Sequence, residues 1–179
     1  ISTPFPYPTL VRSSYRQAVV LKPDYAEAYS NLGANLQDLG KLEDAEASYR
    51  QAINLKPDFF EALTNLGVTQ HELGRFHDAE ASFRDVIAHK PDFDQAHNNL
   101  GATLIALGRL KEATKSYSAA LSINPSDQQA LLGRAEALFA QGEFECALID
   151  FGDGDAGESK SRLLETLYKL GRIDDACQK

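Results

Sequence analysis

Several residue types are missing or rare in this chain. It has 179 residues, with no Met, no Trp, two Cys and four His. Cys146 and Cys177 lack the spacing of a metal site, and no two histidines are placed i, i+4 as ligands on one helical face. We therefore expect two reduced, packed thiols and no metal. The apolar runs are far shorter than the roughly 20 residues of a transmembrane helix, so no span is expected, and the cytoplasm is the default compartment.

Positive charge is also scarce. The chain has 18 Lys and Arg against 26 Asp and Glu, which gives a formal net charge of −8. Binding to a polyanion needs clustered Lys and Arg that displace counterions, so this balance disfavours nucleic acid and anionic membranes. We expect a protein or peptide partner of neutral to basic character instead.

The sequence does contain a clear internal repeat. Segment 60–93 is identical to segment 26–59 at more than half of its positions. Proline recurs with a period of 34 residues, at Pro23, Pro57, Pro91 and Pro125. A repeat of this length indicates stacked supersecondary units, each of which covers the hydrophobic face of its neighbour.

Each repeat predicts two helices. The stretch "AEAYSNLGANLQDLG" places Tyr29, Leu32, Gly33 and Leu36 on one amphipathic stripe, and "KLEDAEASYRQAINLKP" carries a second stripe. We call these helices A and B. Gly40 supplies a left-handed stop after helix A, and prolines end the B helices. Capping boxes are predicted at the starts of the A helices, from Asp24 with Glu27, Asp58 with Glu61, Asp92 with Gln95 and Ser126 with Gln129.

Small residues recur on the buried stripe of helix A. They are Gly33, Gly67, Gly101 and Ala135. A residue without a long side chain lets two helices approach closely, so a larger side chain at these positions should overpack the contact.

With this pattern the chain resembles the tetratricopeptide repeat (TPR) family. Leu32-Gly33 after Tyr29, then Ala45, Tyr49 and Pro57, follow the family motif, and residues 60–127 repeat it twice. The array is similar to the superhelix that precedes the catalytic region of O-linked N-acetylglucosamine transferases. The resemblance implies an all-α fold, a right-handed α-solenoid of antiparallel helix pairs.

The period also divides the chain. Residues 1–14 are expected to be an extended, proline-rich segment, or an artefact that resembles translated sequencing-adapter read-through at the end of a metagenomic fragment. The array should then occupy residues 15–179. It comprises a half unit at 15–25, regular units at 26–59, 60–93 and 94–127, and divergent units at 128–156 and 157–179.

The stretch "DFGDGDAGES" at residues 150–159 breaks the period. A phosphate loop is disfavoured because a helix rather than a strand precedes it, and an EF-hand is excluded because Glu158 and Leu164 stand where Gly and Glu are needed. We expect the preceding helix to end early in a solvated acidic turn, followed by a helix at about 158–170. A nonspecific cation site that includes Asp150 and Asp153 is the weaker alternative.

A peptide-binding groove is predicted on the stripe of helix A that lies opposite the buried one. Asn recurs there, and its amide both donates and accepts hydrogen bonds, so an Asn ladder suits an extended peptide backbone. The alternative is plain duplication of a solvated residue. The resemblance favours binding, since helix A lines the concave face in TPR proteins. The predicted groove residues are Asn31, Asn65, Asn99, Asp38, Glu72, Ala34, Val68, Ala102, Ile105, Leu132 and Phe139.

These observations favour a noncatalytic interaction scaffold that holds a partly apolar, neutral to basic segment. No nucleophile with a base, metal triad or convincing phosphate loop is visible, so no enzyme activity and no cofactor are expected. None of the predicted groove residues is basic, which disfavours the acidic chaperone tails that some relatives clamp with Lys and Arg. The alternatives are a regulatory or substrate-recruiting fragment of a larger transferase or hydroxylase, and self-association through exposed ends of the array.

Overall fold

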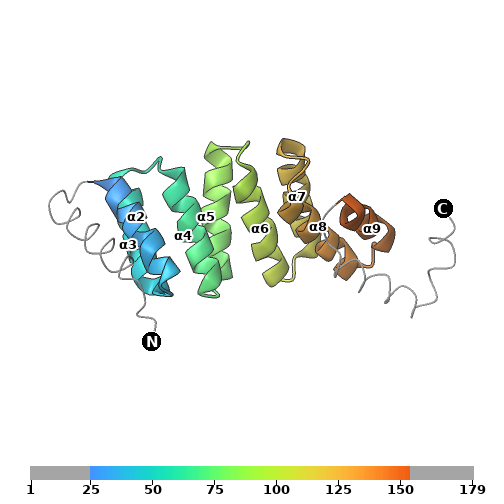
Figure 1. Ribbon diagram of the computed structural model, residues 1–179, viewed down its shortest axis with the longest axis horizontal. Coiled ribbons are helices and arrows are strands. Elements are labelled where there is room, and N and C mark those ends of the chain that lie inside the picture. Colours follow the sequence, from blue (N-terminus) through green and yellow to red (C-terminus); the bar gives the residue numbers. More distant parts are fainter. Residues whose placement is uncertain (1–24, 154–179) are drawn as a thin grey trace, which may run out of the picture. The chain divides into compact units, whose positions relative to one another are not determined.

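The computed structural model describes residues 25–153, apart from the side chains of residues 145 and 151–153. Every regular element in this range is an α-helix, and successive helices run antiparallel (Figure 1). The helices are α2 (Ala26–Asp38), α3 (Leu42–Leu55), α4 (Phe60–Glu72), α5 (Phe76–His89), α6 (Asp94–Ala106), α7 (Leu110–Ile123), α8 (Gln128–Gln141) and α9 (Phe144–Asp153). The predicted all-α fold class of antiparallel helix pairs is confirmed. The even-numbered helices are the A helices and the odd-numbered ones the B helices.

The chain forms two compact units. Unit 1 is Ile1–Pro91 and contains α2 to α5, and unit 2 is Asp92–Lys179 and contains α6 to α9. Within unit 1, α2 packs on α3, α3 on α4 and α4 on α5, while α2 also touches α4; in unit 2, α6 likewise touches both α7 and α8. The two A helices of each unit are therefore neighbours, so their outward residues form one row per unit.

The close approach predicted at the small residues is present. A Cβ atom on Gly67 would lie 2.6 Å from Cε1 of Phe83, and one on Gly33 would lie 2.8 Å from Cε1 of Tyr49. Phe83 and Tyr49 are each 1% exposed. The aromatic rings of α3 and α5 therefore fill the space that glycine leaves on the preceding A helix.

The predicted left-handed stops of the A helices are also confirmed. Gly40 has φ +69°, and the following Lys41 N–H donates to the carbonyl of Leu36 at 2.8 Å, as in a Schellman motif. Gly74, Gly108 and Gly142 have positive φ angles as well. A side chain at these positions would be strained by the backbone conformation rather than by crowding.

The predicted capping boxes are wrong. Helices α2, α4 and α6 start after Tyr25, Phe59 and Phe93, and none of these helices has a side-chain cap. Each helix begins one residue later than a capping box requires, because an aromatic residue follows the Pro-Asp pair and occupies the N-cap.

Helix α8 is the exception, and Ser126 is not its cap. At the N-cap of α8 stands Asp127, whose Oδ1 accepts from the backbone N–H groups of Gln129 at 2.9 Å and Ala130 at 3.3 Å. Its Oδ2 accepts from the buried side chain of Asn98 on α6. A single carboxylate therefore caps one helix and ties it to its neighbour.

The remaining sequence predictions concern the cysteines, the segments near the two ends of the chain and membrane spans. Cys146 is a free, exposed thiol and not a packed one, because it lies on the outer side of α9. Helix α9 is described as far as Asp153, and the turn and helix predicted beyond it lie outside the described residues, as do Cys177 and the segment at 1–14. No helix between residues 25 and 153 has the length and apolar character needed to cross a bilayer.

Candidate functional site

The predicted groove residues all lie on the A helices. Asn31, Asp38 and Glu72 are exposed, and the other eight are half-buried. Helix α2 carries Asn31, Ala34 and Asp38; α4 carries Asn65, Val68 and Glu72; α6 carries Asn99, Ala102 and Ile105; α8 carries Leu132 and Phe139. We refer to these residues of α2 and α4 as the unit 1 row, and to those of α6 and α8 as the unit 2 row.

The three asparagines use their backbone but not their side chains within the described structure. The carbonyl of Asn31 accepts from Asn35 Nδ2 at 2.9 Å, and the carbonyls of Asn65 and Asn99 accept from threonine hydroxyls one turn later at 2.8 Å. No described residue pairs with their side-chain amides, and Nδ2 of Asn99 is buried without a partner. An unsatisfied buried amide is costly unless a ligand or water completes it, so these amides are available for recognition.

At one end of the unit 1 row, Gln37 connects three helices. Its Nε2 donates to Glu72 Oε2 at 3.2 Å, and its Oε1 accepts from the hydroxyls of Tyr49 and Thr69, both at 3.2 Å. Burial raises the pKa of Tyr49, and the nearby charges of Asp38 and Glu72 raise it further. The structure therefore brings the two predicted acidic groove residues to one place, next to a buried tyrosine hydroxyl.

The importance of Gln37 was missed in the sequence. Its repeat partners are His71, Ile105 and Phe139, so the position is variable and shows no pattern. The one signal was its distance of 12 residues from Tyr49, which places the two side chains on the facing sides of an antiparallel helix pair.

The corresponding end of the unit 2 row is apolar. Ile105 stands at the repeat position of Gln37, and Ala137 at that of Thr69. Tyr117, at the position of Tyr49, has no hydroxyl hydrogen bond within residues 25–153. Burial, with a contribution from the charge of Glu136, raises the pKa of Tyr117 to about 12.

Gly133 has a packing role that the sequence did not suggest. It stands at the repeat position of Asn31, Asn65 and Asn99. A Cβ atom on Gly133 would overlap the tip of the Tyr117 ring, while one on Gly101 would lie 2.8 Å from Cζ of the same ring. Tyr117 therefore lies between α6 and α8, which excludes Asn at position 133.

Two of the predicted apolar anchors are already packed. Leu132 and Phe139 lie against the small core of α8 and α9 around Ala135 and Ala147. The ring centroids of Phe139 and Phe144 are 5.4 Å apart. Part of each side chain therefore belongs to the fold, and only the remainder is exposed.

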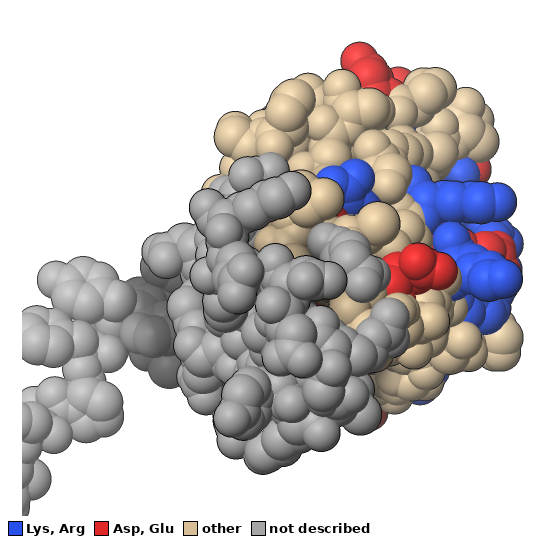
Figure 2. Space-filling view, turned by 90° about the vertical axis from the view of Figure 1, so that its right-hand side faces the viewer, with Lys and Arg blue, Asp and Glu red and all other residues tan. Residues whose placement is uncertain are grey.

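The A helices are strongly biased in charge. The four described ones, α2, α4, α6 and α8, carry six acidic residues, Glu27, Asp38, Glu61, Glu72, Asp94 and Glu136, and a single Lys or Arg, Arg134. In Figure 2 the Lys and Arg side chains of the visible face gather toward one margin rather than covering it evenly.

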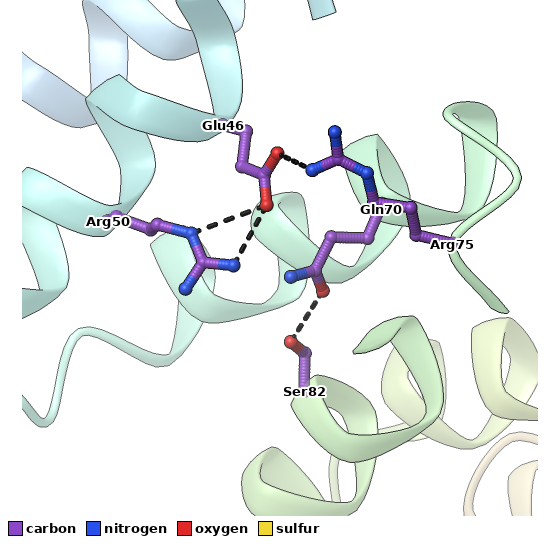
Figure 3. Close-up of polar contacts among 5 residues, drawn as sticks. All are labelled: Glu46, Arg50, Gln70, Arg75 and Ser82. Atoms are coloured by element: carbon purple, nitrogen blue, oxygen red, sulfur yellow. Dashed lines mark hydrogen bonds and ion pairs between the residues drawn. The ribbon is translucent and has the colours of Figure 1, made fainter. Parts of the chain in front are cut away.

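A buried carboxylate on α3 forms a second polar cluster in unit 1 (Figure 3). Glu46 is 6% exposed, and it accepts from Arg50 Nη2 at 2.9 Å and from Arg75 Nη1 at 2.5 Å. Burial raises the pKa of Glu46, but the Arg50 hydrogen bond and the charges of Arg75 and Arg50 outweigh it, so the net pKa is lowered. Beside this cluster, Ser82 Oγ donates to Gln70 Oε1 at 2.7 Å.

Unit 2 has its own buried pair. Arg134 Nη2 and Nε donate to the two oxygens of Asp150 at 2.6 and 2.7 Å, and Nη1 donates to Ser118 Oγ at 3.3 Å. The hydrogen bonds that Arg134 donates to Asp150 raise the pKa of Arg134. The alternative of a cation site that uses Asp150 is therefore wrong, because this carboxylate is 3% exposed and bound to arginine. Within the described part of the chain no cluster of side chains suits a metal ion.

Comparison with known proteins identifies the repeat. A family described as "TPR repeat" matches residues 35–74, and one described as "Tetratricopeptide repeat" matches residues 70–127 and 103–161. No curated protein matches the sequence.

Solved structures share the fold. MamA superposes with a TM-score of 0.74 at 22% identity, over 90% of each chain. YrrB, described as a TPR protein with an unusual peptide-binding site, gives 0.75 at 20% identity, over 91% of this chain and 87% of its own. The first TPR of Spaghetti (RPAP3), bound to the HSP90 peptide SRMEEVD, gives 0.64 at 24%, over 65% of this chain and 93% of its own. With the period of 34, the close packing at glycine and the antiparallel helix pairs, these matches show that the chain belongs to the tetratricopeptide repeat family.

Proposed function

We propose that the protein is a noncatalytic interaction scaffold whose A helices bind an extended peptide segment. The observation that carries this proposal is the unpaired state of the side-chain amides of Asn31, Asn65 and Asn99 within the described structure. An amide can donate to a peptide carbonyl and accept from a peptide N–H, so successive asparagines match the alternation of an extended backbone.

The charges of the two rows suggest the composition of the ligand. Asp38 and Glu72 lie together in the unit 1 row, and no Lys or Arg stands on α2 or α4 to neutralise them. Ile105, Leu132 and Phe139 make the unit 2 row apolar. A segment bound at the unit 1 row should therefore carry Lys or Arg, and a segment bound at the unit 2 row should carry apolar side chains.

The structural relatives support a peptide ligand, while the charges of this chain disfavour an acidic one. The RPAP3 domain holds SRMEEVD, a peptide with three carboxylate side chains and one arginine. On the described A helices of this chain the one Lys or Arg is Arg134, which is bound to Asp150. An acidic tail would therefore meet carboxylates without a compensating cation, which costs affinity through like-charge repulsion.

The proposal is tested by a pull-down from a source lysate with the intact chain and with the triple variant Asn31→Ala, Asn65→Ala, Asn99→Ala. These substitutions remove three amides without altering charge, and circular dichroism verifies that the variant is folded. We expect partners of the intact chain to be lost from the triple variant.

A matched control replaces a side-chain amide on a B helix. Gln51 on α3 is half-buried and lies outside the asparagine rows, so Gln51→Ala removes one amide from the other helix layer. Partners should be retained by this control. Retention by the triple variant as well would show that the asparagines are a relic of duplication, and the proposal would fail.

A further inference from the structure

Unit 1 also contains a groove on its B helices, away from the asparagines. It has a volume of about 480 Å³ and runs between α3 and α5, with α4 as its floor. The floor is apolar, from Leu63 and Leu66, and Ile53 adds to it from α3. The remaining lining residues are Arg50, Asn54, Gln70, Asp78, Ala81, Ser82 and Asp85.

The α5 wall of this groove is acidic. Asp78, Ser82 and Asp85 follow at i, i+4 and i+7, so they stand on one face of the helix, with the two carboxylates about 10 Å apart along its axis. Asp78 has no ionic partner within the described residues, and Asp85 faces only His89 at 3.3 Å. Ala81 and Ser82 between them are short, which keeps the groove open.

The opposite wall contains a cation that is only partly neutralised. Arg50 lies across the groove, but its Nε and Nη2 both donate to the buried carboxylate of Glu46 (Figure 3). Arg75 binds the other oxygen of Glu46, so two arginines share one carboxylate and one positive charge remains. Asp78 and Asp85 add two negative charges on the α5 wall, so the groove and this cluster together stay acidic.

The corresponding helices of unit 2 show which side chains can fill the equivalent space between two B helices. There Arg134 stands at the repeat position of Leu66, Asp150 at that of Ser82 and Ser118 at that of Arg50. The Arg134 side chain crosses from α8 to both α7 and α9, and its guanidinium binds Asp150 and Ser118. The chain itself thus places an arginine beside an acid between two B helices, where unit 1 has a groove.

We propose that the groove of unit 1 is a second docking site, which binds a basic segment of a partner protein. An apolar side chain of the segment packs on Leu63 and Leu66, and flanking Lys or Arg residues pair with Asp78 and Asp85. The stem of an arginine contributes apolar contact on the same floor. This site is separate from the asparagine rows, so one molecule can hold two partner segments at once.

The probe is the peptide acetyl-Gly-Arg-Leu-Arg-Gly-amide, titrated into the ¹⁵N-labelled full chain and followed by amide chemical shifts. Two comparison peptides replace both Arg residues by Glu, or Leu by Gly. We expect shifts around the groove residues of α3, α4 and α5, weaker binding of the Gly peptide and none of the Glu peptide.

The first variant is Asp78→Asn, Asp85→Asn, which changes only exposed side chains. It should weaken the probe by about fivefold or more, as expected for the loss of exposed ion pairs that act together. The control Glu43→Gln, Asp44→Asn removes the same charge from the first turn of α3, outside the groove, and should bind the probe as the parent does.

A second variant closes the groove with the chemistry of unit 2. Arg50→Ser, Leu66→Arg, Ser82→Asp copies Ser118, Arg134 and Asp150, and it should abolish binding of the probe. The inference is overturned if the probe shifts the asparagine rows but not the groove, or if Asp78→Asn, Asp85→Asn binds as tightly as the Glu43 and Asp44 control. The Asn31, Asn65 and Asn99 triple variant should bind the probe normally, so failure here and failure of the proposed function give different results.

Discussion

Tyr49 and Tyr117 occupy the same repeat position, one in each unit, yet their hydroxyls meet different surroundings. Both rings pack against a glycine of the preceding A helix. The Tyr49 hydroxyl donates to Gln37, whereas Tyr117 lies against Gly133 and has no such partner within the described residues, where Ile105 takes the repeat position of Gln37. The repeat thus conserves the packing of the ring and varies what lies beyond it, which makes the unit 1 row polar and the unit 2 row apolar.

At the B helices the difference between the units is reversed, because here unit 1 is the more apolar and unit 2 the more polar. Unit 1 places Leu66 and Ser82 beside a groove, and unit 2 places the buried pair of Arg134 and Asp150 at the same positions. Each unit therefore combines one polar and one apolar feature, on different helix layers. Exchanging residues between equivalent positions of the two units therefore shows which of them stabilise the fold and which of them bind a partner.

The largest effect is expected from breaking the buried pair of unit 2. Asp150→Ala leaves Arg134 without its counter-ion and should lower the free energy of unfolding by about 3 kcal/mol, the lower end for a broken buried pair because a quarter of Arg134 is exposed. Urea denaturation measures this loss. The double variant Arg134→Leu, Asp150→Ser, which copies unit 1, should recover most of it; equal destabilisation by both variants would contradict the equivalence of the positions.

The next effect concerns the packing that both units share. Gly67→Leu places a side chain where even a Cβ would lie 2.6 Å from Phe83, so it should cost about 2 kcal/mol through overpacking. Thermal unfolding followed by circular dichroism measures it, with Val68→Leu on the half-buried side of α4 as the control. An unchanged melting temperature for Gly67→Leu would contradict the packing described for the helix pairs.

A smaller difference should separate the two tyrosines. Tyr49→Phe removes a hydrogen bond to Gln37 and should cost about 1 kcal/mol, whereas Tyr117→Phe removes a hydroxyl that has no described partner and should cost close to none. Both free energies come from urea denaturation under the same conditions. Equal losses of unfolding free energy in the two variants would contradict the claim that only the Tyr49 hydroxyl makes a stabilising hydrogen bond.

The smallest effect is a dependence of unit 1 on acid. The pKa of Glu46 is lowered in the folded chain, so its carboxylate contributes stability above its ordinary pKa of 4.5 and loses it as pH falls through and below that value. Amide hydrogen exchange at pH 6 and pH 4 should show protection of α3 and α4 decreasing toward pH 4. In Glu46→Gln this decrease should be smaller, and a decrease of the same size would assign the acid sensitivity to other groups.

The fold could be predicted from the sequence because the same residue pattern occurs in several successive repeats. The period, the buried stripe and the positive φ of Gly40 follow from local rules that each unit obeys. The capping prediction failed because Asp58 and Asp92 also suit a turn, and the choice between cap and turn depends on the aromatic residue that follows.

The polar contacts could not be predicted, since they join residues far apart in sequence. Glu46 meets Arg75 across 29 positions, and Arg134 meets Asp150 across two helices. Nothing in the local pattern distinguishes a buried Glu46 from the exposed Glu43 three residues earlier. For the candidate site, the positions on the A helices followed from the helical period. The hydrogen bonds by which Gln37 connects three helices could be seen only in the structure.

The most direct test of the asparagine rows is the NMR spectrum of their side-chain amides as a captured partner peptide is added. The ¹⁵N-labelled chain gives separate NH₂ signals for Asn31, Asn65 and Asn99, and Gln51 on α3, which lies outside both proposed sites, serves as the internal reference. The account predicts that the three signals move together and saturate while that of Gln51 stays in place. Three unchanged row signals in the presence of bound peptide would contradict binding at the A helices.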